Sequence, residues 1–143
     1  MSPMQKRGVS QYGKVAVGTE TSFASPHRLI QMLMEGALDK IAFARGQIER
    51  KDYGEKGRNI TWAISIIQGL SESLDMESGG EIAANLEGLY DYMVRCLTIA
   101  NKDNDIAKLD EVASLLKEVK QAWDAMPGDM KQVAQKSAAT SAG

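Results

Sequence analysis

Apolar residues recur at steps of three and four along most of the chain, a spacing that places them on one face of an α-helix. The first such stripe follows Ser25-Pro26, where serine is a favoured helix cap and proline fits the first turn. The stripe reaches about residue 50 and consists of Ile30, Leu33, Met34, Ala37, Ile41, Ala44 and Ile48. The pattern therefore predicts a first helix over residues 25–50.

Three more helical stripes follow, and short polar or glycine-containing segments separate them. The second lies within residues 52–74, the third within 81–101 and the fourth within 105–126. Gly80 stands between the second and third stripes, and glycine is favoured where a helix stops. No alternation of period two indicates a strand. Four helices joined by short connections predict an all-α fold, an antiparallel up-down four-helix bundle.

The two ends of the chain lack this periodicity. Residues 1–24 are rich in Gly, Ser, Thr and Val, and residues 127–143 are dominated by Ala, Ser, Gln and Lys. We therefore predict a mobile N-terminal arm over 1–24, a bundle over 25–126 and a disordered tail over 127–143. Tyr12 and Val15 make the arm apolar enough to dock on an apolar surface.

Composition and charge exclude several classes of function. A formal net charge of −2 leaves no basic footprint for nucleic acid. No apolar run approaches the ~18 residues that span a bilayer, and the first residues lack a signal segment, so membrane insertion is not expected. A single cysteine, Cys96, excludes an internal disulfide. We expect a cytoplasmic protein.

The sequence offers no constellation for catalysis or metal binding. A dinuclear metal bundle needs inward Glu-x-x-His motifs on two helices, and the chain has one histidine, His27, at a helix start. Cys96 borders an apolar stripe and is expected to be a small buried thiol. The carboxylates lie on polar faces or at helix starts. We therefore expect no catalytic, cofactor or metal site, and no enzyme.

Surplus apolar residues stand out on the second helix. Counted from Ile60 at about 100° per residue, Trp62 and Ile66 fall near 200° and 240°, well away from the stripe of Ile60, Ile64 and Ile67. On the same scale Leu70 lies at about 280°, next to the stripe.

The third helix carries a similar surplus, because Tyr92 and Ile99 lie about 100° from the centre of its stripe. That stripe is expected to face the core and consists of Ile82, Leu86, Leu89, Met93, Leu97 and Ala100. Two interpretations remain open. The stripes are simply wide, since each bundle helix contacts two neighbours, or the surplus forms a groove that takes a partner helix.

Ordered sequence blocks resemble a known family, the flagellin-specific export chaperones called FliS. The blocks are Tyr12, residues 25–38 (SPHRLIQMLMEGAL), 41–44 (IAFA), 66–70 (IIQGL), Leu74-Asp75, 79–81 (GGE), Asn85-Leu86, 89–93 (LYDYM), Ala100-Asn101 and Ala122-Trp123. Met34 departs from the family, in which an aromatic is frequent at this place, and the tail lies outside the shared pattern.

The resemblance implies a cytosolic chaperone that binds the C-terminal region of flagellin, prevents its premature polymerisation and delivers it to the flagellar type III export gate. It also implies that the arm carrying Tyr12 covers part of the groove when flagellin is absent. The candidate contacts from the helix geometry and the arm are Tyr12, Val15, Trp62, Ile66, Leu70, Tyr92 and Ile99.

Because Ile66 is placed on the surface, Ile66→Asp is predicted to abolish binding without changing the far-UV circular dichroism (CD). The alternative function is a self-assembling structural protein that uses the same apolar surface to dimerise.

Overall fold

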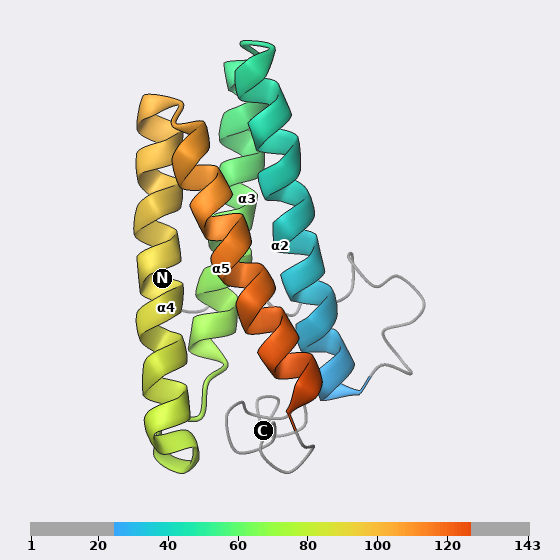
Figure 1. The fold of residues 1–143 in the computed structure, drawn as a ribbon, viewed down its shortest axis with the longest axis vertical. Coiled ribbons are helices and arrows are strands. Elements are labelled where there is room, and N and C mark those ends of the chain that lie inside the picture. The colour runs from blue at the N-terminus through green and yellow to red at the C-terminus, as the bar shows by residue number, and fades with distance from the viewer. Residues whose placement is uncertain (1–24, 127–143) are drawn as a thin grey trace.

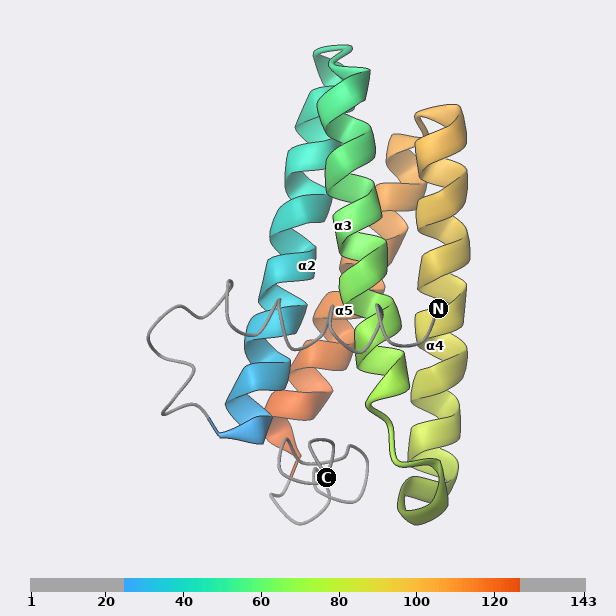
Figure 2. The same cartoon turned by 180° about the vertical axis from the view of Figure 1, so that it is seen from behind.

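A computed structural model describes residues 25–126, which contain the helices α2 (Pro26–Glu49), α3 (Tyr53–Glu72), α4 (Met76–Asp103) and α5 (Ile106–Ala125). Successive helices run in opposite directions, as Figure 1 and the opposite view in Figure 2 show. Each helix packs against two others, in the closed order α2, α3, α4, α5 and back to α2. The predicted antiparallel up-down bundle is confirmed, whereas the predicted arm (1–24) and tail (127–143) lie outside the described residues.

Polar side chains cap three of the helix starts. Ser25, Asp75 and Asp105 each accept a hydrogen bond from the backbone N–H three residues later, at 3.1, 3.0 and 3.2 Å. Such caps satisfy N–H groups that have no partner inside the helix. The short polar connections therefore end one helix and start the next within a few residues.

The helix α4 begins one turn earlier than the apolar stripe indicates. Gly80, predicted to separate two helices, lies inside α4 and breaks its regular geometry with φ 52° and ψ −128°. This backbone conformation is readily available only to glycine, because a Cβ atom would clash with the main chain. The first turn of α4 thus joins the rest of the helix through a kink.

Gly80→Ala is expected to lower the free energy of unfolding by about 1–3 kcal/mol, because alanine is strained at a positive φ. Gly88 lies in the same helix with helical geometry and open space around its Cα. Gly88→Ala is therefore the matched control, and it should stabilise the protein by about 0.5–1 kcal/mol. Urea unfolding of both variants measures the two changes, and equal effects would contradict the conformational explanation.

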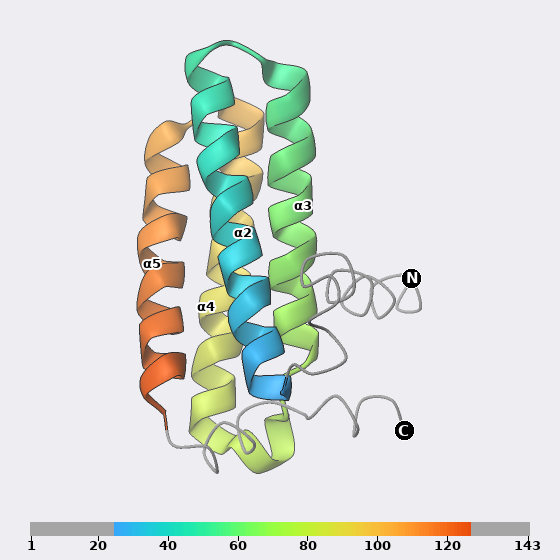
Figure 3. The same cartoon turned by 90° about the vertical axis from the view of Figure 1, so that its right-hand side faces the viewer.

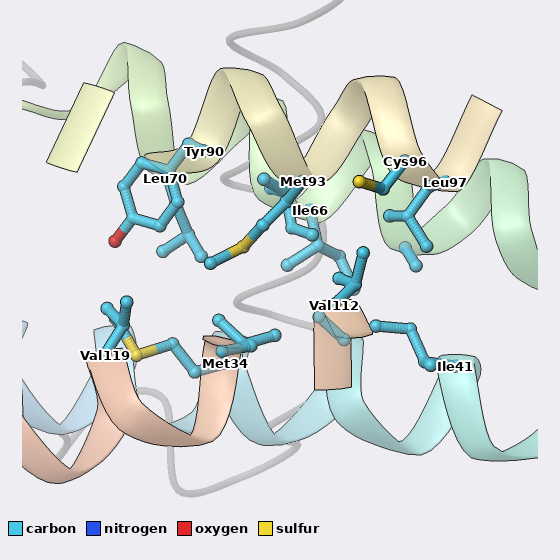
Figure 4. Close-up of a cluster of buried hydrophobic side chains, with 14 of the residues drawn as sticks. Met34, Ile41, Ile66, Leu70, Tyr90, Met93, Cys96, Leu97, Val112 and Val119 are labelled. Carbon is cyan, nitrogen blue, oxygen red and sulfur yellow. The ribbon is translucent and has the colours of Figure 1, made fainter. Parts of the chain in front are cut away.

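The apolar stripes meet in one continuous core along the axis of the bundle. Figure 4 shows side chains from all four helices converging, with Met34 and Ile41, Ile66 and Leu70, Tyr90 and Leu97, and Val112 and Val119 among them. One buried cation accompanies this core: the Lys56 ammonium donates a 2.7 Å hydrogen bond to the carbonyl of Asn101. That carbonyl lies near the C-terminus of α4, where a positive charge is favoured.

The placement of Ile66 outside the core is wrong. Ile66 is only 4% exposed and Leu70 is 0% exposed, whereas Ile64, taken as part of the centre of the stripe, is only partly buried. The reason is that α3 packs against both α2 and α4, so its buried arc is wide and extends toward α2. A Cβ atom added to Gly36 of α2 would lie 3.9 Å from the Cδ1 atom of Ile66.

Candidate partner-binding site

An open groove lies between α4 and α5 near the C-terminal end of α5. It has a volume of about 330 Å³ and a predominantly apolar lining. We call it the α4/α5 groove. The sides of the groove consist of Ile82, Leu86, Leu89, Leu115, Ala122 and Met126. Its deeper lining consists of Met34, Tyr90, Val119 and Trp123. Two polar residues, Asn85 and Glu118, also line it.

The groove forms because α4 and α5 draw apart toward this end. In Figure 1, α5 starts close to the C-terminal end of α4 and ends beside the start of α2. Ile82, Leu86 and Leu89 follow helical spacing on α4 but remain only partly buried. Across the groove, the facing residues of α5 are Glu118 and Ala122, which are both exposed. The charged Glu118 and the small Ala122 do not fill the space between the two helices. Apolar side chains are therefore left open to a partner.

Tyr90 lines the groove from α4 and is 0% exposed. Its hydroxyl has no hydrogen-bond partner among the described residues. Figure 4 shows this hydroxyl pointing away from α4, toward the side on which Val119 and Met34 lie. Burial raises the pKa of Tyr90 far above its ordinary value, so the group remains a neutral hydroxyl at physiological pH.

Polar contacts close the α4–α5 seam beyond the groove. The hydroxyl of Tyr92 donates a hydrogen bond to the carboxylate of Glu111, and this bond is the main cause of the raised pKa of Tyr92. The Lys108 ammonium lies 3.5 Å from the same carboxylate. The two tyrosines of α4 thus differ: one hydroxyl is paired across the seam, and the other is buried without a partner.

The seam between α2 and α5 is also closed by charged groups. Figure 3 shows α2 between α5 and α3. Ion pairs bridge α2 and α5. The Arg45 guanidinium lies 2.8 Å from Asp110, and the Lys120 ammonium lies 3.6 Å from Glu35. These pairs are partly exposed to solvent and contribute little stability each. The seam between α2 and α5 therefore presents charged groups to a partner, whereas the α4/α5 groove presents apolar side chains.

An exposed aromatic surface, which we call the α2/α3 surface, lies on the opposite side of the bundle across α2 and α3. Trp62 is 38% exposed, and the Lys40 ammonium lies 4.1 Å from the centre of its ring. Phe43, 54% exposed, has its ring centre 5.7 Å from the same ammonium. An aromatic pair around a cation is typical of contact surfaces, because aromatic side chains supply much apolar area with few rotatable bonds.

The structure divides the predicted contact residues among three places. Trp62 lies on the α2/α3 surface, and Tyr92 and Ile99 lie on α4 outside the groove, with Ile99 41% exposed. Ile66 and Leu70 belong to the core, as described above. Tyr12 and Val15 lie outside the described residues, so their contact remains a prediction.

The groove residues of α4 were predicted to face the core. Ile82, Leu86 and Leu89 have the spacing of core positions, and only the distance to α5 leaves them open. One signal in the sequence points to the difference. The facing positions of α5 are Glu118 and Ala122, whereas earlier turns of that helix present Leu109, Val112 and Leu116 to the core.

The described residues contain no cluster of three His, Cys, Asp or Glu side chains that could hold a metal ion. Cys96 is buried, as predicted, and its sulfur lies 4.0 Å from a carboxylate oxygen of Glu111. The ring of His27 packs on Trp123, with the ring centres 5.3 Å apart. Between residues 25 and 126, no helix has a stretch apolar and long enough to cross a membrane.

Comparisons with known proteins agree with the resemblance described above. The family described as "Flagellar protein FliS" matches residues 8–129. The flagellar secretion chaperone FliSB of Pseudomonas aeruginosa is 52% identical over 118 residues, which cover 82% of this chain and 94% of the relative. The flagellar secretion chaperones FliS of Salmonella typhimurium and Vibrio cholerae are 45% and 42% identical, over 81% of this chain and 87% and 85% of theirs.

Proposed function

The chain belongs to the FliS family of flagellar proteins, and we propose that it is a secretion chaperone that binds the C-terminal region of flagellin in the cytoplasm. It prevents premature polymerisation of flagellin and delivers it to the export gate of the flagellar type III apparatus. The observation that carries this proposal is the α4/α5 groove, an apolar surface left open within a helical bundle whose relatives are named secretion chaperones.

The positions of the apolar surfaces suit a segment that folds on binding. The groove between α4 and α5 and the aromatic surface around Trp62 lie on opposite sides of the bundle. A single rigid helix reaches only one of them, whereas a segment with several short helices can wrap around the bundle and reach both. Such coupled folding costs ordering entropy but covers a large surface. Tyr12 and Val15 belong to the proposal as contacts of the arm.

Calorimetric titration with the last ~50 residues of the cognate flagellin tests the proposal, since a segment of that length contains several helical segments at 1.5 Å per residue. We expect one-to-one binding with a negative heat-capacity change, because apolar surface is buried. A folded bundle that gives no binding would contradict the proposal. Light scattering of the protein alone then distinguishes the alternative, in which the same surfaces hold a stable dimer.

A further inference from the structure

We infer that the hydroxyl of Tyr90 is the polar contact that sets the position of the bound segment in the α4/α5 groove, by donating a hydrogen bond to an uncharged acceptor on that segment. This inference rests on the proposed function. It assigns one residue a role in recognition that the apolar lining of the groove cannot fulfil, because apolar contacts alone let a helix slide along a groove.

The hydroxyl of Tyr90 is a buried polar group without a hydrogen-bond partner among the described residues, which is unusual in proteins. Buried polar groups are almost always hydrogen-bonded, because an unpaired one has lost its water without compensation. The Tyr90 side chain is 0% exposed, and its hydroxyl has no partner among the described residues. Phenylalanine fills nearly the same volume without this cost. The retained oxygen therefore points to a partner that arrives from outside the described bundle.

The groove gives this partner a path to the hydroxyl. Tyr90 lines the groove together with Met34 and Met126, and Figure 4 shows its oxygen directed away from α4 on the side of Met34. Methionine side chains are unbranched and adapt easily to a new neighbour. In the inferred complex, a shift of these side chains opens the lining of the groove to the entering segment.

The surroundings define the chemistry of the acceptor. The hydroxyl is neutral, so it can donate to a carbonyl, a carboxamide or another hydroxyl. A carboxylate is disfavoured, because burying a charge in an apolar lining is costly and Glu118 already places a negative charge at the groove. Backbone carbonyls within a helix are already paired. The acceptor is therefore an Asn, Gln, Ser or Thr side chain on the apolar face of the segment, or a free carbonyl at the end of one of its helices.

Tyr90→Phe tests the inference through two changes of opposite sign. Removing an unpaired hydroxyl should raise the melting temperature of the free protein by about 4 °C, because the folded state no longer bears the cost of a buried polar group without a partner. The same variant should bind the flagellin C-terminal segment about tenfold more weakly, because the complex loses its hydrogen bond. Tyr92→Phe is the matched comparison for stability: its hydroxyl is paired with Glu111, so its loss should lower the melting temperature.

Each outcome decides between the alternatives. A lower melting temperature for free Tyr90→Phe would mean that the hydroxyl has a partner within the chain, and would overturn the inference. Equal affinity of Tyr90→Phe and the wild type would overturn it too, while the proposed function would stand. If the wild type itself does not bind the segment, the proposed function and the inference fail together. Combining Tyr90→Phe with alanine at each polar residue of the segment should identify one residue whose effect disappears in the variant.

Discussion

Ile66→Asp is expected to unfold the bundle, with loss of the helical far-UV CD signal and a drop of at least about 4 kcal/mol in the free energy of unfolding. Ile66 is 4% exposed and packs toward α2 near Gly36. The substitution removes a core side chain and places a carboxylate among buried apolar side chains. Since a domain of this size is stable by only about 5–15 kcal/mol, such a loss removes much of its stability.

The control for this experiment is Thr61→Asp, which introduces the same carboxylate into an exposed position of α3. Its CD spectrum and its urea midpoint should remain close to those of the wild type, because surface substitutions rarely change stability by more than about 0.5 kcal/mol. If Ile66→Asp remains fully helical with an unchanged midpoint, the burial of Ile66 described here is incorrect. Ile66 would then lie on the surface of α3, as the helical periodicity predicted.

Leu86→Glu is expected to weaken the binding of flagellin at least about 100-fold while leaving the bundle folded. Leu86 is only partly buried in the free protein, so glutamate can extend into the solvent from the groove at moderate cost. In the complex the same carboxylate would be buried against apolar side chains of the segment, which adds a desolvation cost to the lost contact of the leucine. Calorimetric titration measures the change in affinity, and CD verifies the fold.

Ala84→Glu serves as the matched control for Leu86→Glu. Ala84 is exposed and lies two residues earlier on α4, about 200° around the helix from Leu86. The control adds the same charge to the same helix, so it should bind flagellin as the wild type does. Equal weakening by both variants would attribute the effect to net charge, and unaltered binding by both would remove the groove from the proposed binding surface.

The local pattern of the sequence was sufficient to predict the helices and their arrangement. Steps of three and four between apolar residues indicate which side chains share a face, and Ser25-Pro26 and the polar connections indicate where helices begin and end. Short connections then require neighbouring helices to be antiparallel. The family resemblance was likewise visible in ordered blocks of residues, because it depends on residue identity and not on contacts.

The candidate site could be predicted only in part. Trp62 and Ile99 were placed on the surface by their angles alone, and the structure leaves both exposed. Ile66 and Leu86 were assigned to the wrong environments, each in the opposite sense: the first is in the core and the second lines the groove. Ile66 was placed well away from its stripe and Leu86 within its stripe, and the helical angle alone does not show how close a neighbouring helix lies to either side chain.

Residue spacing, capping and residue identity were enough to predict the four helices of residues 25–126, their limits apart from the start of α4, and the family. Which apolar residues are buried and which are open depends on how the helices pack against one another. Whether a side chain such as Leu86 is covered depends on how far the neighbouring helix lies from it, and α5 draws away from α4 toward one end. Helical periodicity defines the direction of a side chain around its own axis, but it contains no information about that distance.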